Sequence, residues 1–213
     1  KLDRACHKRG LPLTLNWMIM PLDAYTDLAD DSLLAQYSQG DAAAARALTA
    51  RLTPRVFGHA VRVLGDRAEA EDVTQDAMMR LWKVAPDWRM GEAKVSTWLY
   101  RVTANLCTDR LRRKRGIGLN EADDPLDPSP SVTDQLQTRE RMNALQAGLQ
   151  TLPERQRQAV ILRHIEGLAN PEIAEILEIS TEAVESLTAR GKRALAQALA
   201  PARKKLGYED DSI

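Results

Sequence analysis

The stretch from Asp66 to Arg115 constrains the fold more than any other part of the chain, because its apolar residues recur at helical spacing. Residues three and four positions apart lie on one face of an α-helix, so each such run predicts a buried stripe. A loop with Pro86, Trp88 and Gly91 divides two runs, and Asp66 stands where an N-cap residue belongs. Two packed helices are predicted, with buried stripes of Ala70, Val73, Ala77, Leu81 and Val84 in the first and of Val95, Trp98, Leu99, Val102 and Leu106 in the second.

The charges of these two helices are segregated. The first begins with Glu69, Glu71 and Asp72, whereas the second ends in the basic run Arg110–Arg115. The chain has 30 basic and 30 acidic residues, and this zero net charge alone would argue against a nucleic-acid partner. The segregation favours instead a protein partner for the acidic face and a nucleic acid for the basic one. A polar row of the second helix is predicted to face away from the core: Arg101, Asn105, Thr108, Asp109 and Arg112.

Helices are also predicted before this pair. The segment Asp31–Gln39 has helical spacing and stops at Gly40, and Asp41 then caps an Ala-rich helix. Thr53-Pro54 is predicted to break that helix and to start another, because proline is tolerated only in the first turn. Together these segments predict a helical domain over residues 25–115.

Three segments lie outside the predicted domains. Residues 1–24 are an N-terminal extension of unknown role, whose apolar run is far shorter than the roughly 20 residues of a membrane span. A start at Met18 or Met20 would turn most of this extension into a leader. Residues 116–132 are rich in Pro, Asp, Gly and Ser and predict a flexible acidic linker, either a plain spacer or a shield for basic surfaces. Residues 208–213 form an acidic tail.

A second helical domain is predicted over residues 133–207. One helix runs from Pro153 towards Gly167, and Asn170 is predicted to cap a short helix that leads through the turn Glu178–Ser180 into another. This arrangement is typical of a DNA-binding helix-turn-helix, although helical hairpins without DNA partners share the pattern. Residues of the second helix are predicted to face the major groove, with the last two suited to phosphates: Thr181, Glu182, Glu185, Ser186, Ala189, Arg190, Lys192 and Arg193.

No catalytic or metal-binding constellation is recognisable. The two cysteines have no partners at metal-ligand spacing and fit a reduced, cytoplasmic protein. The histidines are far apart in sequence, with His59 expected inside a helix and His164 at the surface. We therefore predict a protein that is not an enzyme and needs no cofactor. No strand pattern of useful length occurs, so the predicted fold class is all-α: two small helical domains joined by the linker.

The chain resembles a bacterial RNA polymerase sigma factor of the extracytoplasmic-function group over about residues 30–200. AEDVTQDAMMRLWK is similar to the family's polymerase-binding segment, and STWLYRVTANLCTDRLRRKR to its promoter −10 helix. LPERQRQAVILRHIEGLANPEIAEILEISTEAV is similar to its −35-binding domain. The resemblance implies that residues 25–115 are sigma region 2 and that residues 133–207 are sigma region 4.

The resemblance also implies roles for matching residues. The outward residues of the first helix would bind core RNA polymerase: Asp72, Gln75, Asp76, Met79 and Trp82. The loop and the second helix would bind the −10 element with Trp88, Lys94, Arg101, Asn105, Arg112 and Arg113. Trp82 is equally expected in the core, and Trp88 either stacks on an unpaired base or anchors its loop.

The predicted −35 reader departs from the family pattern. Glu185 occupies a position where the family often has Lys or Arg, and a carboxylate repels phosphate but accepts a hydrogen bond from cytosine. Glu178 replaces the small residue that is often found in the turn. These differences concern the −35 sequence and not the mode of binding.

The predicted function is promoter selection for core RNA polymerase, with an anti-sigma factor implied as a further partner and no membrane insertion. One alternative is a stand-alone helix-turn-helix regulator, which leaves the polymerase-type block unexplained. Another is a sigma-like mimic that sequesters an anti-sigma factor, which would have no need of the basic run Arg110–Arg115.

Overall fold

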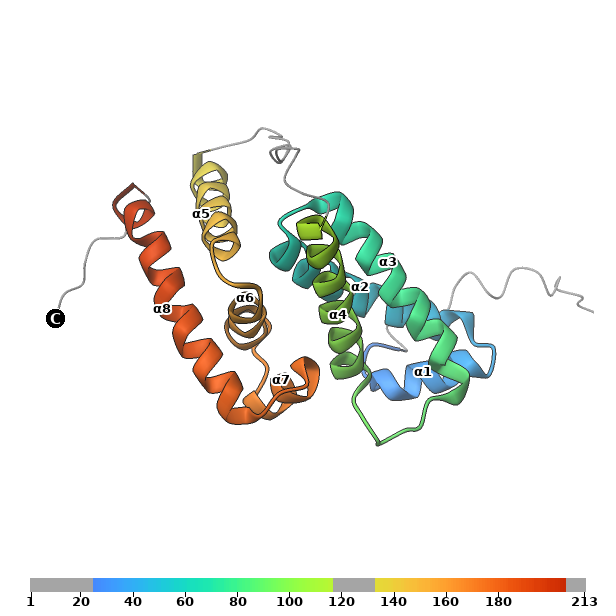
Figure 1. Cartoon of the computed structure of the whole chain (residues 1–213). Coiled ribbons are helices and arrows are strands. Elements are labelled where there is room, and N and C mark those ends of the chain that lie inside the picture. Colours follow the sequence, from blue (N-terminus) through green and yellow to red (C-terminus); the bar gives the residue numbers. More distant parts are fainter. Residues whose placement is uncertain (1–24, 117–132, 206–213) are drawn as a thin grey trace, which may run out of the picture.

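The computed structural model describes residues 25–116 and 133–205 (Figure 1). The predicted extension, the tail and the linker, apart from Gly116, lie outside these ranges. All regular structure in the described ranges is helical, which confirms the all-α prediction. The first domain contains α1 (Asp30–Ser38), α2 (Ala42–Leu64), α3 (Arg67–Val84), the 3₁₀ turn η2 (Ala85–Asp87) and α4 (Val95–Gly116). The second contains α5 (Thr133–Gln150), α6 (Glu154–Val160), the π-helical turn η3 (Ile161–Ile165), α7 (Asn170–Leu177) and α8 (Thr181–Lys205).

The first domain is built around α2, which packs against α1, α3 and α4. Its N-terminus is capped as predicted, because the Asp41 carboxylate accepts hydrogen bonds from the backbone N–H groups of Ala43 (2.8 Å) and Ala44 (3.3 Å). Its C-terminus ends at Gly65, where φ is +75°, a conformation that glycine adopts without strain. The predicted cap of α3 is confirmed as well, since the Asp66 carboxylate accepts from the N–H of Glu69 at 3.1 Å.

The predicted break at Thr53-Pro54 is wrong, because α2 runs through Pro54 without interruption. A proline inside a helix removes one backbone hydrogen bond. The buried residues on either side, Leu52 and Val56, belong to the same core, so burial of one continuous stripe outweighs the lost bond.

The helix predicted from Pro153 to Gly167 is not regular. The α6 helix widens at η3, where the N–H of Glu166 donates to the carbonyl of Ile161, five residues earlier. Neighbouring side chains in this turn enter different cores: Ile161 packs into the large core and Leu162 into a smaller one around α7. A sequence read at 3.6 residues per turn does not predict this.

The helix-turn-helix forms as predicted, with one change at its start. Ala169 and not Asn170 is the N-cap of α7, and its N–H donates to the Glu172 carboxylate at 3.1 Å. Glu178 in the turn has a φ of +53°, the left-handed conformation that ends α7. Ser180 caps α8 as predicted, because its hydroxyl accepts from the N–H of Ala183 at 3.2 Å.

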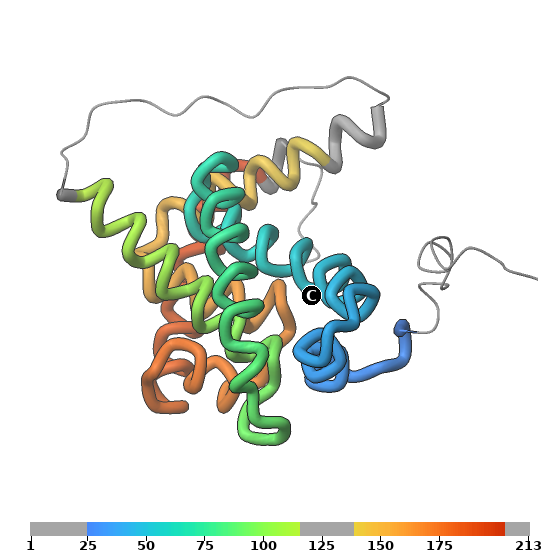
Figure 2. Tube along the Cα trace, turned by 90° about the vertical axis from the view of Figure 1, so that its right-hand side faces the viewer, coloured from blue at the N-terminus to red at the C-terminus, as the bar shows by residue number. Residues whose placement is uncertain are grey.

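The two domains pack directly on each other. In Figure 2 the light-green α4 runs in front of the orange helices of the second domain, and α4 contacts α7. The larger core contains first-domain residues together with second-domain residues such as Leu149, Leu152 and Val160. No helix in the described ranges is both long and apolar enough to span a membrane.

Candidate protein and nucleic-acid interfaces

The outer face of α3 gathers four of the predicted polymerase-binding residues. Asp72, Gln75, Asp76 and Met79 are all exposed, and Met79 keeps 61% of its surface accessible. The opposite face of the same helix is buried. A large apolar side chain that stays exposed beside carboxylates is suited to contact another protein.

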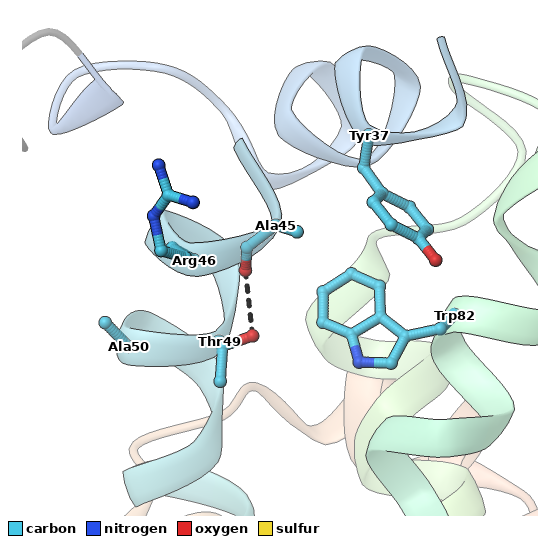
Figure 3. Close-up of a pocket in the computed structure, with 6 residues that line it drawn as sticks. All are labelled: Tyr37, Ala45, Arg46, Thr49, Ala50 and Trp82. Atoms are coloured by element: carbon cyan, nitrogen blue, oxygen red, sulfur yellow. Dashed lines mark hydrogen bonds between the residues drawn. The ribbon is translucent and has the colours of Figure 1, made fainter. Parts of the chain in front are cut away.

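Trp82, the fifth of these residues, is half-buried and lies on Tyr37 of α1, with ring centroids 4.8 Å apart (Figure 3). The two rings form one side of a shallow pocket of about 390 Å³, whose other side is the first turns of α2. Trp82 therefore joins α3 to α1 and also borders an open surface, so both sequence interpretations describe part of its position.

Arg110 of α4 is a contact that the sequence did not indicate. Its guanidinium lies 2.5 Å from Glu69, 3.4 Å from Asp72 and 3.6 Å from Asp76, all on α3. The hydrogen bond with Glu69, followed by the neighbouring carboxylates, raises the pKa of Arg110. Two of the predicted polymerase-binding carboxylates are thus oriented by a residue from the basic run.

The loop between α3 and α4 is anchored by its tryptophan. Trp88 is half-buried and meets Trp98 of α4 edge to face, with centroids 5.9 Å apart. This position agrees with the anchoring interpretation of Trp88. Lys94, at the end of the loop, forms an ion pair of 2.7 Å with Glu172 of α7, and this hydrogen bond lowers the pKa of the Glu172 carboxyl.

The polar row of α4 divides into two groups. Asn105, Arg112 and Arg113 are exposed and Arg101 is half-buried, so these residues form an outward basic face. Thr108 was predicted to share that face, but this is wrong: its hydroxyl accepts a hydrogen bond of 3.0 Å from Gln158 of α6. The second domain covers this neighbouring strip of α4, which a sequence pattern within one helix does not reveal.

The predicted groove-facing residues lie together on the outward side of α8. Glu182, Glu185, Ser186, Arg190, Lys192 and Arg193 are exposed and Thr181 is half-buried. The Glu185 carboxylate lies 3.4 Å from the side-chain amide of Asn170 at the start of α7. Val184 is buried and holds this helix against α7.

Buried reactive side chains serve packing in this fold. His59 is fully buried, and desolvation lowers its pKa to about 4, so the imidazole is neutral at pH 7. Burial raises the pKa of the Cys107 thiol to about 12, which removes its nucleophilic form at neutral pH. His164 is exposed, as predicted. No cluster of three metal-ligating side chains occurs in residues 25–116 and 133–205.

Comparison with known proteins places this arrangement in a family. The models for Sigma-70 region 2 and for Sigma-70, region 4 match residues 48–117 and 142–195. The ECF RNA polymerase sigma factor SigM of Mycobacterium tuberculosis (strain ATCC 25618 / H37Rv) is 32% identical over 171 residues, which cover 80% of this chain and 85% of SigM. The chain belongs to the ECF sigma factors. The resemblance identified in the sequence is thereby confirmed.

Other proteins extend the comparison. The ECF sigma factor SigE of Mycolicibacterium smegmatis is 34% identical over 150 residues, 68% of this chain, but the chain spans only 58% of the length of SigE. The structure of CnrH in complex with the cytosolic domain of CnrY has a TM-score of 0.61 and 25% identity, and covers 82% of this sigma factor and 99% of CnrH. The two-domain helical fold of this sigma factor therefore has a counterpart among solved structures.

Proposed function

We propose that this sigma factor directs core RNA polymerase to a specific set of promoters and starts transcription there, in the cytoplasm. The observation that carries the proposal is the separation of surfaces. The exposed face of α3 with Met79, the basic face of α4 with Arg112 and Arg113, and the outward side of α8 are all present in one chain. A regulator without polymerase would have no use for the first of these surfaces.

Each predicted residue keeps its role in this proposal, except that Trp88 anchors its loop and does not contact the −10 strand. Asp72, Gln75, Asp76, Met79 and Trp82 bind core polymerase. The −10 strand follows α4 past Lys94, Arg101, Asn105, Arg112 and Arg113, with Trp88 holding the adjoining loop in place. The −35 duplex is read by Thr181, Glu182, Glu185 and Ser186, while Arg190, Lys192 and Arg193 bind phosphates. Residues 25–115 and 133–207 are the corresponding functional units.

We also infer that a regulatory protein holds this sigma factor inactive. CnrH, which shares the fold, was solved with the cytosolic domain of CnrY bound to it. An anti-sigma factor that covers the α3 and α4 faces would block polymerase and promoter together.

Transcription in vitro from a promoter library, with purified core polymerase, tests the proposal. We expect new start sites that share a −35 and −10 pair and that need both components. Binding of the protein alone to palindromic DNA, without new starts, would instead support a stand-alone regulator. If the folded protein gave neither result yet bound an anti-sigma factor, the sequestering mimic would be supported.

A further inference from the structure

We infer that Asn170 of α7 and Glu185 of α8 form one unit that reads the −35 element. The Asn170 amide holds the Glu185 carboxylate in the orientation that accepts a hydrogen bond from cytosine, so the unit selects a C·G base pair. The inference rests on the proposed function and deepens it, because it names a base pair and adds a residue to the reader. Asn170 is a positioning residue, and Glu185 is the group that touches the base.

The unit joins the two helices of the helix-turn-helix, which meet at one end of the second domain (Figure 1). The side-chain amide of Asn170 donates to Glu185 Oε1 at 3.4 Å, across 15 positions of the chain. Asn170 is half-buried and Glu185 is exposed, so the amide supports the carboxylate from the side of the protein. A carboxylate accepts several hydrogen bonds through its two oxygens, so Glu185 keeps acceptor capacity for a further donor.

The backbone under both residues is fixed by packing. Val184, which precedes Glu185, is fully buried in the small core with Ile173 of α7. The N–H of Ile179 in the turn donates to the carbonyl of Ala174 at 3.1 Å and so ties the turn to α7. Because the two helices cannot shift easily relative to each other, the carboxylate is preorganised and loses less conformational entropy when it binds.

Glu182, the other acid of the reading row, is held in a different way. A hydrogen bond with its own backbone N–H, followed by one with the Ser180 hydroxyl, lowers the pKa of the Glu182 carboxyl. The Glu182 carboxylate therefore lies at the start of α8, where Ser180 also caps the helix. Glu185 lies almost one turn further along and has its partner in the other helix of the motif.

The chemistry of a carboxylate determines the base that it selects. An ionised carboxylate only accepts hydrogen bonds. In the major groove cytosine presents an amino donor and no acceptor of its own, whereas the amino group of adenine stands beside the acceptor N7, which repels a carboxylate. Glu185 therefore favours cytosine over adenine.

Asn170 also reduces the repulsion between Glu185 and the DNA backbone. The first helix of a helix-turn-helix crosses that backbone, and Asn170 is the first residue of α7. A side-chain amide has two N–H donors, so one can hold Glu185 while the other binds a phosphate. The amide then lies between two negative groups and donates to both.

The test measures base preference with the full chain bound to core polymerase, by selection from promoters randomised over the −35 element. The proteins compared are the wild type, Asn170→Ala, Glu185→Ala and the variant with both changes. Asn170→Asp, which places a second carboxylate beside Glu185, is an additional variant. Glu175→Ala removes an exposed acid of α7 and is the matched control. Thermal unfolding checks that each variant is folded.

We expect the wild type to prefer C·G about fivefold at one position of the element, as one amino–carboxylate contact provides. Asn170→Ala should lower this preference to about twofold, because the carboxylate loses its orientation but not its charge. Asn170→Asp and Glu185→Ala should abolish it. Adding Asn170→Ala to Glu185→Ala should change nothing further at that position, whereas a merely structural role for Asn170 would weaken binding at every position in both backgrounds.

An unchanged C·G preference in both Asn170 variants would overturn the inference. An equal effect of Asn170→Ala in the presence and in the absence of Glu185 would overturn it as well, and so would the same loss in the Glu175→Ala control. Failure of the proposed function is a separate result, because the wild type bound to polymerase would then show no base preference at any position of the −35 element.

Discussion

The two helices proposed to meet promoter DNA, α4 and α8, reach similar lengths but use their surfaces differently. The α8 helix exposes its reading row apart from the half-buried Thr181, and its position depends on the local turn and on packing against α6 and α7. In contrast, α4 exposes Asn105 and Arg112 while a neighbouring strip is buried by the other domain. The comparison teaches that the reading face of α8 follows from its own sequence, whereas that of α4 depends on the arrangement of the domains.

The largest expected effect concerns the exposed side of α4. Replacing Arg112 and Arg113 by Ala should remove two charged contacts to phosphate, worth about 2 kcal/mol each, and so lower promoter opening by close to a thousandfold. Permanganate footprinting of the −10 region measures opening, and native gels measure polymerase binding, which should not change. Arg55→Ala with Arg67→Ala, two exposed arginines of α2 and α3, is the control. Unchanged opening would remove this face of α4 from the mechanism.

A smaller effect is expected from His59, a buried side chain of α2 that packs against α4. His59 lies edge to face against Tyr100, with centroids 5.6 Å apart, and Arg62 and Glu166 are nearby. Because the folded pKa of about 4 is below the unfolded value near 6.5, the unfolded chain binds a proton more readily. The contribution of neutral His59 to the free energy of unfolding is therefore fully present above pH 6.5. It is lost as the pH drops towards 4, by about 3 kcal/mol in all.

Urea unfolding at several pH values checks this. His59→Leu should lose that share of the pH dependence, while other groups titrate equally in both proteins. An identical pH dependence would mean that His59 has the same pKa in the folded and the unfolded chain. If the Leu variant does not fold, His59→Gln provides the same comparison.

A still smaller effect is expected where Gly191 of α8 packs closely against α6. A Cβ atom on Gly191 would lie 2.6 Å from Val160 Cγ2 and 3.1 Å from the Gln156 carbonyl oxygen. Gly191→Ala should therefore cost about 2 kcal/mol through overpacking between α6 and α8. Thermal unfolding measures the loss, and Ala200→Ser, at an exposed position of the same helix, should have little effect. Full stability of Gly191→Ala would show that the two helices separate easily.

The smallest effect concerns reading by α8. Glu185→Lys should change the preferred −35 sequence by about 1 kcal/mol at one base pair, because an acceptor for cytosine becomes a donor for guanine. Selection from a randomised −35 library measures the preference. The exposed Glu175→Lys is the matched charge control. An identical preference in wild type and Glu185→Lys would show that the carboxylate does not face the bases.

Local sequence signals predicted much of this fold. Asp41, Asp66 and Ser180 cap helices as expected, and the outward row of α8 and the exposed acids of α3 lie where helical spacing placed them. Each of these features depends on residues within a few turns of one another.

Features that depend on distant segments were missed. Pro54 stays inside α2 because the core on both sides holds the helix, and the guanidinium of Arg110 reaches carboxylates about 40 positions earlier in the chain. Arg157 gives no signal in the sequence that it is buried, since its partners are backbone carbonyls of the other domain and of its own. A pattern within one helix carries no information about such partners.

The widened turn η3 has a consequence for how the chain tolerates change in length. Removing one residue from Ile161–Ile165 would restore ordinary winding and rotate everything before it by about 100° relative to everything after it. Val160 of α6 and Ile173 of α7 could then no longer both keep their present places in the large and the small core. Insertions and deletions are therefore expected to be rarer in these five residues than in any exposed loop. The turn fixes the rotation of the part of the chain before it relative to the part after it.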